Sequence, residues 1–122
     1  MIIAVTAQSK ELSGEVDPRF GRASHFLLVD SETLHFQVVE NQQNLTLPQG
    51  AGIQAAQNIT QANHKVDVVL TGNCGPKAFK TLAAAGIKVV VGVSGKIEDA
   101  IQRYLRGEFD HTDQANVEGH WM

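Results

Sequence analysis

The sequence has a single cysteine, Cys74, among 122 residues. One cysteine excludes a disulfide within the chain and a cluster site built only from cysteines of one chain. No apolar run approaches the roughly 20 residues needed to span a bilayer, so we expect no membrane partner. The apolar stretch at residues 1–5 has neither a basic segment nor a cleavage site beside it, which favours a cytoplasmic location.

Basic residues are also scarce, with 10 lysines and arginines against 13 aspartates and glutamates, which gives a net charge of −3. They form no dense run, whereas proteins that grip a phosphate backbone normally carry a positive patch. We therefore expect no nucleic-acid partner. A chain of this length suits one domain that buries about two thirds of its surface, so folding requires neither a disulfide nor a structural metal.

Patterns typical of catalysis are missing as well. The chain contains no Walker loop, no dinucleotide fingerprint and no Ser/His/Asp arrangement. The first expected strand, at residues 1–7, carries no carboxylate, which excludes two-metal nuclease chemistry on that strand. The five histidines show no spacing that fits a closed zinc site. We expect a protein that is not an enzyme.

Hydrophobic periodicity predicts eight elements in the order β β β α β α β α. The expected strands cover 1–7, 24–30, 34–41, 66–70 and 87–91, and the expected helices cover 51–63, 76–85 and 96–106. An opening hairpin followed by alternating strands and helices predicts an α/β fold with a mixed five-stranded sheet and helices on both faces. Residues 1–107 form one domain in this interpretation, and residues 108–122 form a flexible C-terminal tail.

Three loops of unusual composition are expected at the carboxyl ends of the strands, where α/β sheets bind ligands. In the first, Arg19 and Arg22 flank Phe20 and Gly21. Two planar donor groups placed in this way can converge on one anion. The alternative is an ordinary turn with solvated arginines.

The second loop, Gly50-Ala51-Gly52, opens a helix that has Gln54 in its first turn. Free N–H groups at a helix start favour an anion, and glycines let a ligand approach the backbone closely. Taken alone, this motif is better explained as a flexible helix entry.

The third loop runs from Thr71 through Gly72, Asn73, Cys74 and Gly75 to Pro76, between a strand and a helix. A thiol at a helix start has a lowered pKa, and the resulting thiolate is a ligand for a soft metal such as copper. Cys74 is therefore a candidate metal ligand. The alternative is a small buried apolar residue, with Asn73 as a turn or cap residue.

Five segments together resemble the dinitrogenase iron–molybdenum cofactor biosynthesis family. They are DPRFGRASHF at 17–26, GAGIQAAQNI at 50–59, VDVVLTGNCGPKAF at 66–79, GIKVVVG at 86–92 and AIQRYLRG at 100–107. Relatives in this family include the cofactor-carrying domains of nitrogenase assembly and the orange protein of sulfate reducers. The resemblance implies a ribonuclease H-like three-layer α/β/α fold without nuclease activity.

The resemblance also implies that the protein binds, holds or delivers a metal–sulfur cluster. In the orange-protein branch this ligand is a molybdenum–copper sulfide anion held non-covalently, and elsewhere in the family it is an iron–molybdenum-type cluster. Cluster donor and acceptor proteins are the expected partners. The candidate cluster-binding residues are Arg19, Phe20, Gly21, Arg22, Gly50, Ala51, Gly52, Gln54, Thr71, Gly72, Asn73, Gly75 and Pro76, with Cys74 as the candidate metal ligand.

Two other functions remain open. A module for a phosphorylated metabolite or a nucleotide would use the same arginines and helix starts, although the chain lacks a phosphate-loop lysine. A metal-independent interaction or regulatory protein would use none of them.

Overall fold

The computed structural model describes residues 1–41, 51–60, 65–112 and 115. The strands are β1 (Ile2–Ala7), β2 (His25–Asp30), β3 (Phe36–Glu40), β4 (Val68–Leu70) and β5 (Lys88–Val90), and the helices are α1 (Ala51–Thr60), α2 (Pro76–Ala84) and α3 (Ile97–Leu105). All eight elements occur in the predicted order, with described ends that differ by at most two residues. Residues 61–63, predicted as the end of the first helix, lie outside the described residues.

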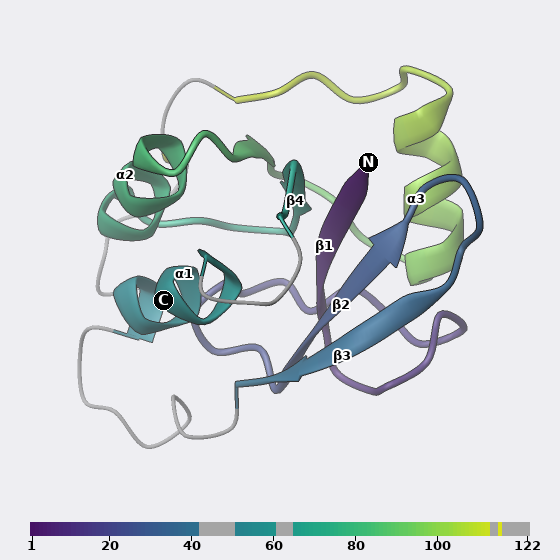
Figure 1. Cartoon of the computed structure of the whole chain (residues 1–122), viewed down its shortest axis with the longest axis horizontal. Helices are drawn as coiled ribbons and strands as arrows, with labels where there is room; N and C mark the ends of the chain where they lie inside the picture. The colour runs from purple at the N-terminus through teal and green to yellow at the C-terminus, as the bar shows by residue number, and fades with distance from the viewer. Residues whose placement is uncertain (42–50, 61–64, 113–114, 116–122) are drawn as a thin grey trace.

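The five strands form one mixed sheet in the order β3-β2-β1-β4-β5 (Figure 1). The first strand is central: it pairs antiparallel with β2 and parallel with β4. The sheet is completed by an antiparallel β2–β3 hairpin and a parallel β4–β5 pair. This arrangement confirms the predicted mixed α/β sheet and the ribonuclease H-like three-layer fold that the resemblance implied.

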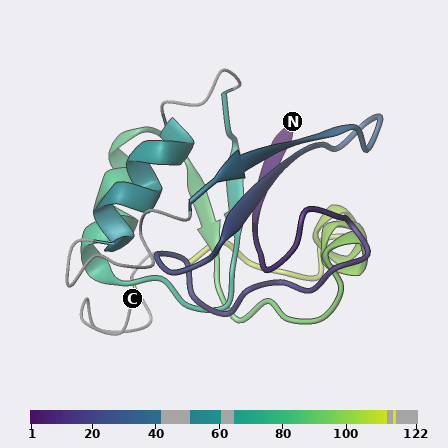
Figure 2. The same cartoon turned by 90° about the horizontal axis from the view of Figure 1, so that it is seen from below.

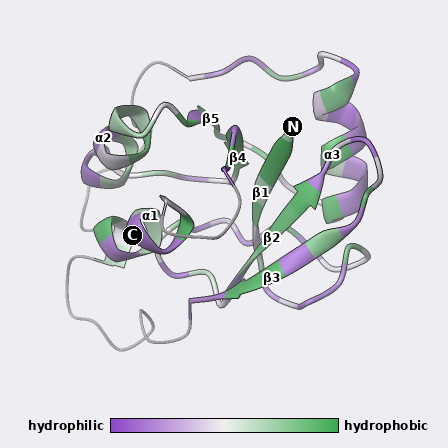
Figure 3. Cartoon of the chain, in the orientation of Figure 1, coloured by the Kyte–Doolittle hydropathy of each residue, from purple (hydrophilic) through white to green (hydrophobic). Residues whose placement is uncertain are grey.

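Each face of the sheet is covered by helices, which gives two separate hydrophobic cores. Helices α1 and α2 lie together on one face, and α3 lies on the other (Figure 2). Along β1, Ala4 faces the α1/α2 core while Ile3, Val5 and Ala7 face the α3 core. Burial on both faces explains why β1 and β2 are almost entirely apolar (Figure 3).

The ends of α2 follow the signals in the sequence. Pro76 occupies the first helical position, where its missing N–H has no partner to lose. Gly86 follows the helix with φ +77°, a left-handed conformation that glycine adopts without steric cost. The start of α2 is thereby fixed directly after the third candidate loop.

The first residues of the segment predicted as a flexible tail, 108–112, make contacts with the rest of the domain. The Arg103 guanidinium lies 4.7 Å from the centre of the Phe109 ring, and the Tyr104 hydroxyl lies 2.7 Å from Nε2 of His111. The N–H of Thr112 donates to the carbonyl oxygen of Val89, at the edge of the sheet. The rest of the predicted tail, apart from residue 115, lies outside the described residues.

Within the part of the chain that the structure describes, no helix has the length and apolar character needed to cross a membrane.

Candidate functional site

The loop of residues 17–22, which we call the arginine loop, lies against the loop that precedes α2. Arg19 and Asn73 form a parallel backbone bridge, and the N–H of Phe20 donates to the Asn73 carbonyl oxygen at 3.1 Å. The side-chain amide of Asn73 in turn donates to the carbonyl oxygen of Pro18 at 3.0 Å. A Cβ on Gly72 would lie 2.7 Å from the Pro18 backbone, so only glycine permits this approach. The prediction that these two loops meet is confirmed.

The arginine loop also lies against the start of α1. A Cβ on Gly21 would lie 2.8 Å from the backbone nitrogen of Gly52 and 3.1 Å from the carbonyl carbon of Ala51. Contact this close is possible only between two backbones without intervening side chains. The arginine loop therefore touches both helix starts, as far as α1 is described. Gly50, the other predicted residue of this loop, lies outside the described residues.

Two buried threonines fasten the arginine loop to the sheet. The Thr6 hydroxyl donates to the carbonyl oxygen of Asp17 at 2.7 Å and lies 3.0 Å from the Thr71 hydroxyl oxygen. The Asp17 carboxylate accepts the N–H of Arg19 at 2.9 Å, which closes the turn. Thr71 has no exposed surface. Thr71, which we predicted as a ligand contact, here helps to hold the loop in place through its contact with Thr6.

Phe20 and Cys74 are also removed from any surface ligand. Both side chains are completely buried in the α1/α2 core, where the Phe20 ring lies 5.5 Å from the ring of Phe26. Burial raises the pKa of the Cys74 thiol to about 12. The lowered pKa expected at a helix start is wrong, because loss of hydration outweighs the helix dipole at this position. The thiol stays protonated at neutral pH, so Cys74 fits the alternative of a small core residue.

Replacement of Cys74 by alanine is expected to leave cluster loading unchanged and to lower the free energy of unfolding by about 1–2 kcal/mol, through lost burial and a small cavity. Metal content per chain and a urea titration measure the two effects. Alkylation of the native thiol at pH 8 is expected to be slow and to become fast after unfolding. Loss of loading with the fold intact would restore Cys74 as a ligand.

The accessible members of the predicted set form a smaller surface around the arginine loop. Arg19 and Pro76 are exposed, and Arg22, Gln54, Gly72 and Asn73 are half-buried. The Arg19 guanidinium forms no ion pair or hydrogen bond within the described residues. The other members of the set are buried, and so they shape the site through the backbone alone: Gly21, Ala51, Gly52 and Gly75.

The helix starts beside this surface carry no negative charge. The first turns of α1 and α2 contain no acidic residue, whereas α3 begins with Glu98 and Asp99. The N-cap of α2, Gly75, provides no side-chain hydrogen bond to the helix. The positive end of the α2 dipole is therefore not neutralised by a side chain of its own helix, which favours an external anion.

A buried polar network that the sequence analysis missed holds the arginine loop against α1. The Asn41 amide donates to the carbonyl oxygens of Gly21 at 3.3 Å and Ala23 at 2.8 Å. Its own oxygen accepts a hydrogen bond from Asn58 at 2.7 Å, and Gln54 donates to Asn58 at 3.1 Å. An asparagine after a strand is common in turns, so the sequence carries no signal for these contacts. Gln54 was predicted to contact a ligand and is here part of the network.

Replacement of Asn41 by leucine is expected to lower the free energy of unfolding by about 1–3 kcal/mol, because carbonyl oxygens and the Asn58 amide would stay buried without partners. The same change loosens the arginine loop and weakens anion binding. Urea titration and anion affinity measure both effects. Asn58→Ala, which removes the hydrogen bonds of Asn58 to Asn41 and Gln54 but keeps those of Asn41 to the loop, is expected to have a smaller effect on each. An Asn41→Leu variant as stable as the natural protein would contradict this role.

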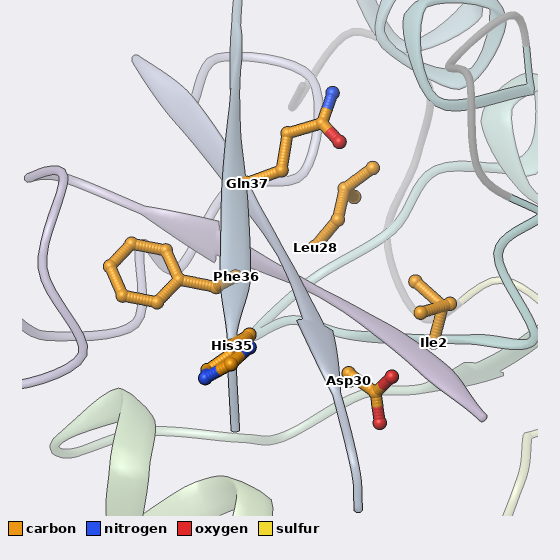
Figure 4. A pocket seen from close by; sticks show the side chains of 6 residues that line it. All are labelled: Ile2, Leu28, Asp30, His35, Phe36 and Gln37. Atoms are coloured by element: carbon orange, nitrogen blue, oxygen red, sulfur yellow. The ribbon is translucent and has the colours of Figure 1, made fainter. Parts of the chain in front are cut away.

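A separate hollow of about 300 Å³ lies at the opposite end of the sheet, beside the start of β1 (Figure 4). It is lined by Ile2, Leu28, Asp30, His35, Phe36 and Gln37. It contains no arginine and no helix start, so it has none of the features that favour an anion. We therefore place the candidate site at the arginine loop.

The described residues contain no group of three or more His, Cys, Asp or Glu side chains that could hold a metal ion. The exposed guanidinium and the helix start fit an anionic ligand.

The profile of the dinitrogenase iron–molybdenum cofactor family matches residues 1–107. This chain belongs to that family. The apo form of the orange protein from Desulfovibrio gigas, another solved structure, is 45% identical with a TM-score of 0.90, covering 95% of this chain and 96% of that one. A putative NifB protein from Thermotoga is 30% identical with a TM-score of 0.79, covering 97% and 98%.

A further relative, an uncharacterized protein of Methanocaldococcus jannaschii, is 29% identical over 113 residues, which is 90% of each chain. The match thus extends over most of both chains.

Proposed function

We propose that this protein is a non-catalytic carrier of an anionic metal–sulfur cluster, which it binds non-covalently at the arginine loop. Membership of the dinitrogenase iron–molybdenum cofactor family supports a role with such clusters. The observation that carries the proposal is the fixed position of the arginine loop, with Arg19 exposed, against the start of α1 and beside the uncapped start of α2.

The cargo that we propose is a molybdenum–copper sulfide anion, with an iron–molybdenum-type precursor as the second choice. The 45% identity to the orange protein of Desulfovibrio gigas supports the first choice. Such an anion is large and soft, and it exposes sulfide to the protein. Guanidinium groups and helix N–H groups suit it, because they bind negative charge without coordinating the metal. We further propose that the carrier acts in the cytoplasm with proteins that donate or receive the cluster.

The test is reconstitution of purified protein with tetrathiomolybdate and copper, followed by metal analysis and visible absorption spectroscopy. We expect a stoichiometric complex with new charge-transfer bands. A protein that stays colourless and metal-free would remove the molybdenum–copper cargo, and the same assay with iron–molybdenum precursors then tests the second choice. Failure of both would contradict the carrier function.

A phosphorylated ligand is the main alternative, because the exposed Arg19 also suits a phosphate group. Calorimetric titration with ATP, ADP and a sugar phosphate separates the two functions. A carrier of sulfide clusters is expected to give no binding heat with any of these three compounds, and micromolar binding of one of them would favour the alternative.

A further inference from the structure

The outer side of α2 carries a basic surface next to the arginine loop. Lys77 and Lys80 are exposed and three residues apart, so they are neighbours on one side of the helix. Arg19 is exposed as well and is tied by its backbone to Asn73, three residues before the helix begins. We call the surface made by Arg19, Lys77 and Lys80 the α2 basic face.

This positive charge is not neutralised by neighbouring carboxylates. Within the described residues the side chains of the α2 basic face form no ion pair, whereas Lys10 pairs with Glu40, and both Arg103 and Arg106 pair with Glu108. Lys65, Lys88 and Lys96 likewise form no ion pair in the described part of the chain, so the grouping of the three charges is what distinguishes the α2 basic face.

The sequence divides its charge in the same way. Residues 41–97 contain five lysines and one acidic residue, Asp67, whereas the remainder contains five basic and twelve acidic residues. Asp67 lies just before β4, at the end of that strand away from the arginine loop, and its carboxylate accepts the N–H of Ile2 at 2.8 Å. Lys77 and Lys80 thus lie in a part of the sequence where positive charge predominates, in a protein of net charge −3.

The side chains around the α2 basic face suit a protein partner better than a nucleic acid. Pro76, Ala83 and Ala84 are exposed and small, so another protein surface can approach the helix closely. The only aromatic residue of α1 and α2, Phe79, is half-buried against the core, so these helices offer no exposed ring on which a base could stack. Two lysines and an arginine are also too few for a dense phosphate contact.

We propose that the α2 basic face is the docking surface for an acidic partner protein. Complementary charge guides such a partner to this side of the molecule and fixes its orientation. The surface adjoins the arginine loop, so a docked partner lies next to the cluster site. The partner's role as donor or receiver of the cluster rests on the proposed function, but the docking surface itself does not.

The docked partner and the anionic cluster share one region of positive charge, and this affects transfer of the cluster. The partner's carboxylates and an anionic cluster both use charge around Arg19, and they repel one another. Binding of either therefore weakens binding of the other, and by thermodynamic linkage the two effects are equal in size. A partner that docks loosens the cluster at the moment when it is delivered.

The first experiment uses the cluster-free full chain and a peptide of twelve glutamates as the probe, followed by NMR at low salt. We expect amide shifts along α2 and the arginine loop and a dissociation constant that rises with ionic strength. Lys80→Glu is expected to raise the dissociation constant about tenfold, because it places like charge on the surface. Lys96→Glu, which makes the same charge change on an exposed lysine at the start of α3, is expected to leave it nearly unchanged.

Three outcomes would overturn the docking surface: no peptide binding at low salt, shifts that map elsewhere, or equal loss of affinity in the two variants. Tighter binding of a twelve-nucleotide oligouridine with the same dependence on Lys80 would also overturn it in favour of nucleic acid.

The second experiment repeats the titration on protein loaded with tetrathiomolybdate and copper. We expect the dissociation constant of the peptide to rise several-fold, and an unchanged value would contradict the coupling between the two anions. Failure to load molybdenum and copper would remove that cargo from the proposed function, while peptide binding to the cluster-free chain would still support the docking surface. Failure of peptide binding would contradict the docking surface and would not affect the test of metal loading.

Discussion

Replacement of both Arg19 and Arg22 by glutamine is expected to weaken binding of a thiomolybdate–copper anion by about a hundredfold. Each charge-assisted hydrogen bond contributes about 1.5 kcal/mol, which corresponds to about tenfold in affinity. Arg19 is exposed and its guanidinium has no partner within the described residues, so its loss has little effect on the fold. Titration followed by the charge-transfer bands measures the affinity, and circular dichroism checks the helix content.

The matched control replaces Lys96 and Arg106 by glutamine. It removes the same total charge from exposed residues at the two ends of α3, on the opposite face of the sheet. We expect the control to bind the anion with nearly the affinity of the natural protein. Equal weakening in both double variants would show that net charge alone governs binding, and unaltered binding in the arginine variant would place the site elsewhere.

Replacement of Gly72 by alanine is expected to lower the free energy of unfolding by about 1–3 kcal/mol and to weaken anion binding. The new methyl group would lie 2.7 Å from the Pro18 backbone, so the arginine loop must move away from the start of α2. Gly21→Ala is expected to act similarly, because its methyl group would lie 2.8 Å from the nitrogen of Gly52. Urea titration and anion affinity measure the two effects.

Gly86→Ala serves as the comparison for these glycine variants. Gly86 has φ +77° and open space around its Cα, so alanine there is strained without touching any other group. We expect a loss of stability of about 1 kcal/mol, from the left-handed backbone alone, with unchanged anion affinity. Weakened binding in Gly86→Ala would mean that general destabilisation accounts for the effects at Gly72 and Gly21.

The order and kind of the elements could be predicted because each has a clear apolar period. The buried strands are short apolar runs, and α1 repeats its buried alanines and isoleucine at helical spacing. The contact between the arginine loop and the loop before α2 could be predicted as well. The two loops follow the carboxyl ends of β1 and β4, which are neighbouring parallel strands. The described strand and helix ends differ from the predictions by up to two residues, because periodicity does not mark where hydrogen bonding stops.

The depth of individual side chains could not be predicted. Phe20, Thr71 and Cys74 lie in loops of polar and small residues, yet all three are completely buried. Their burial arises from the packing of the arginine loop beneath both helix starts, which involves residues more than 50 positions apart. The Asn41 contacts were missed for the same reason, since Gly21 and Ala23 contribute only backbone oxygens to them.

The position of β1 between β2 and β4 determines when the candidate site can first exist during synthesis. The three N-terminal strands pair between neighbours in the sequence, so this antiparallel unit can form early on a growing chain. The arginine loop belongs to that unit, but its partner Asn73 follows β4, which is made more than 50 residues later. A ribosome-bound chain that ends before residue 70 therefore has both arginines without the proposed site, and we expect anion binding only after the parallel β1–β4 pair has formed.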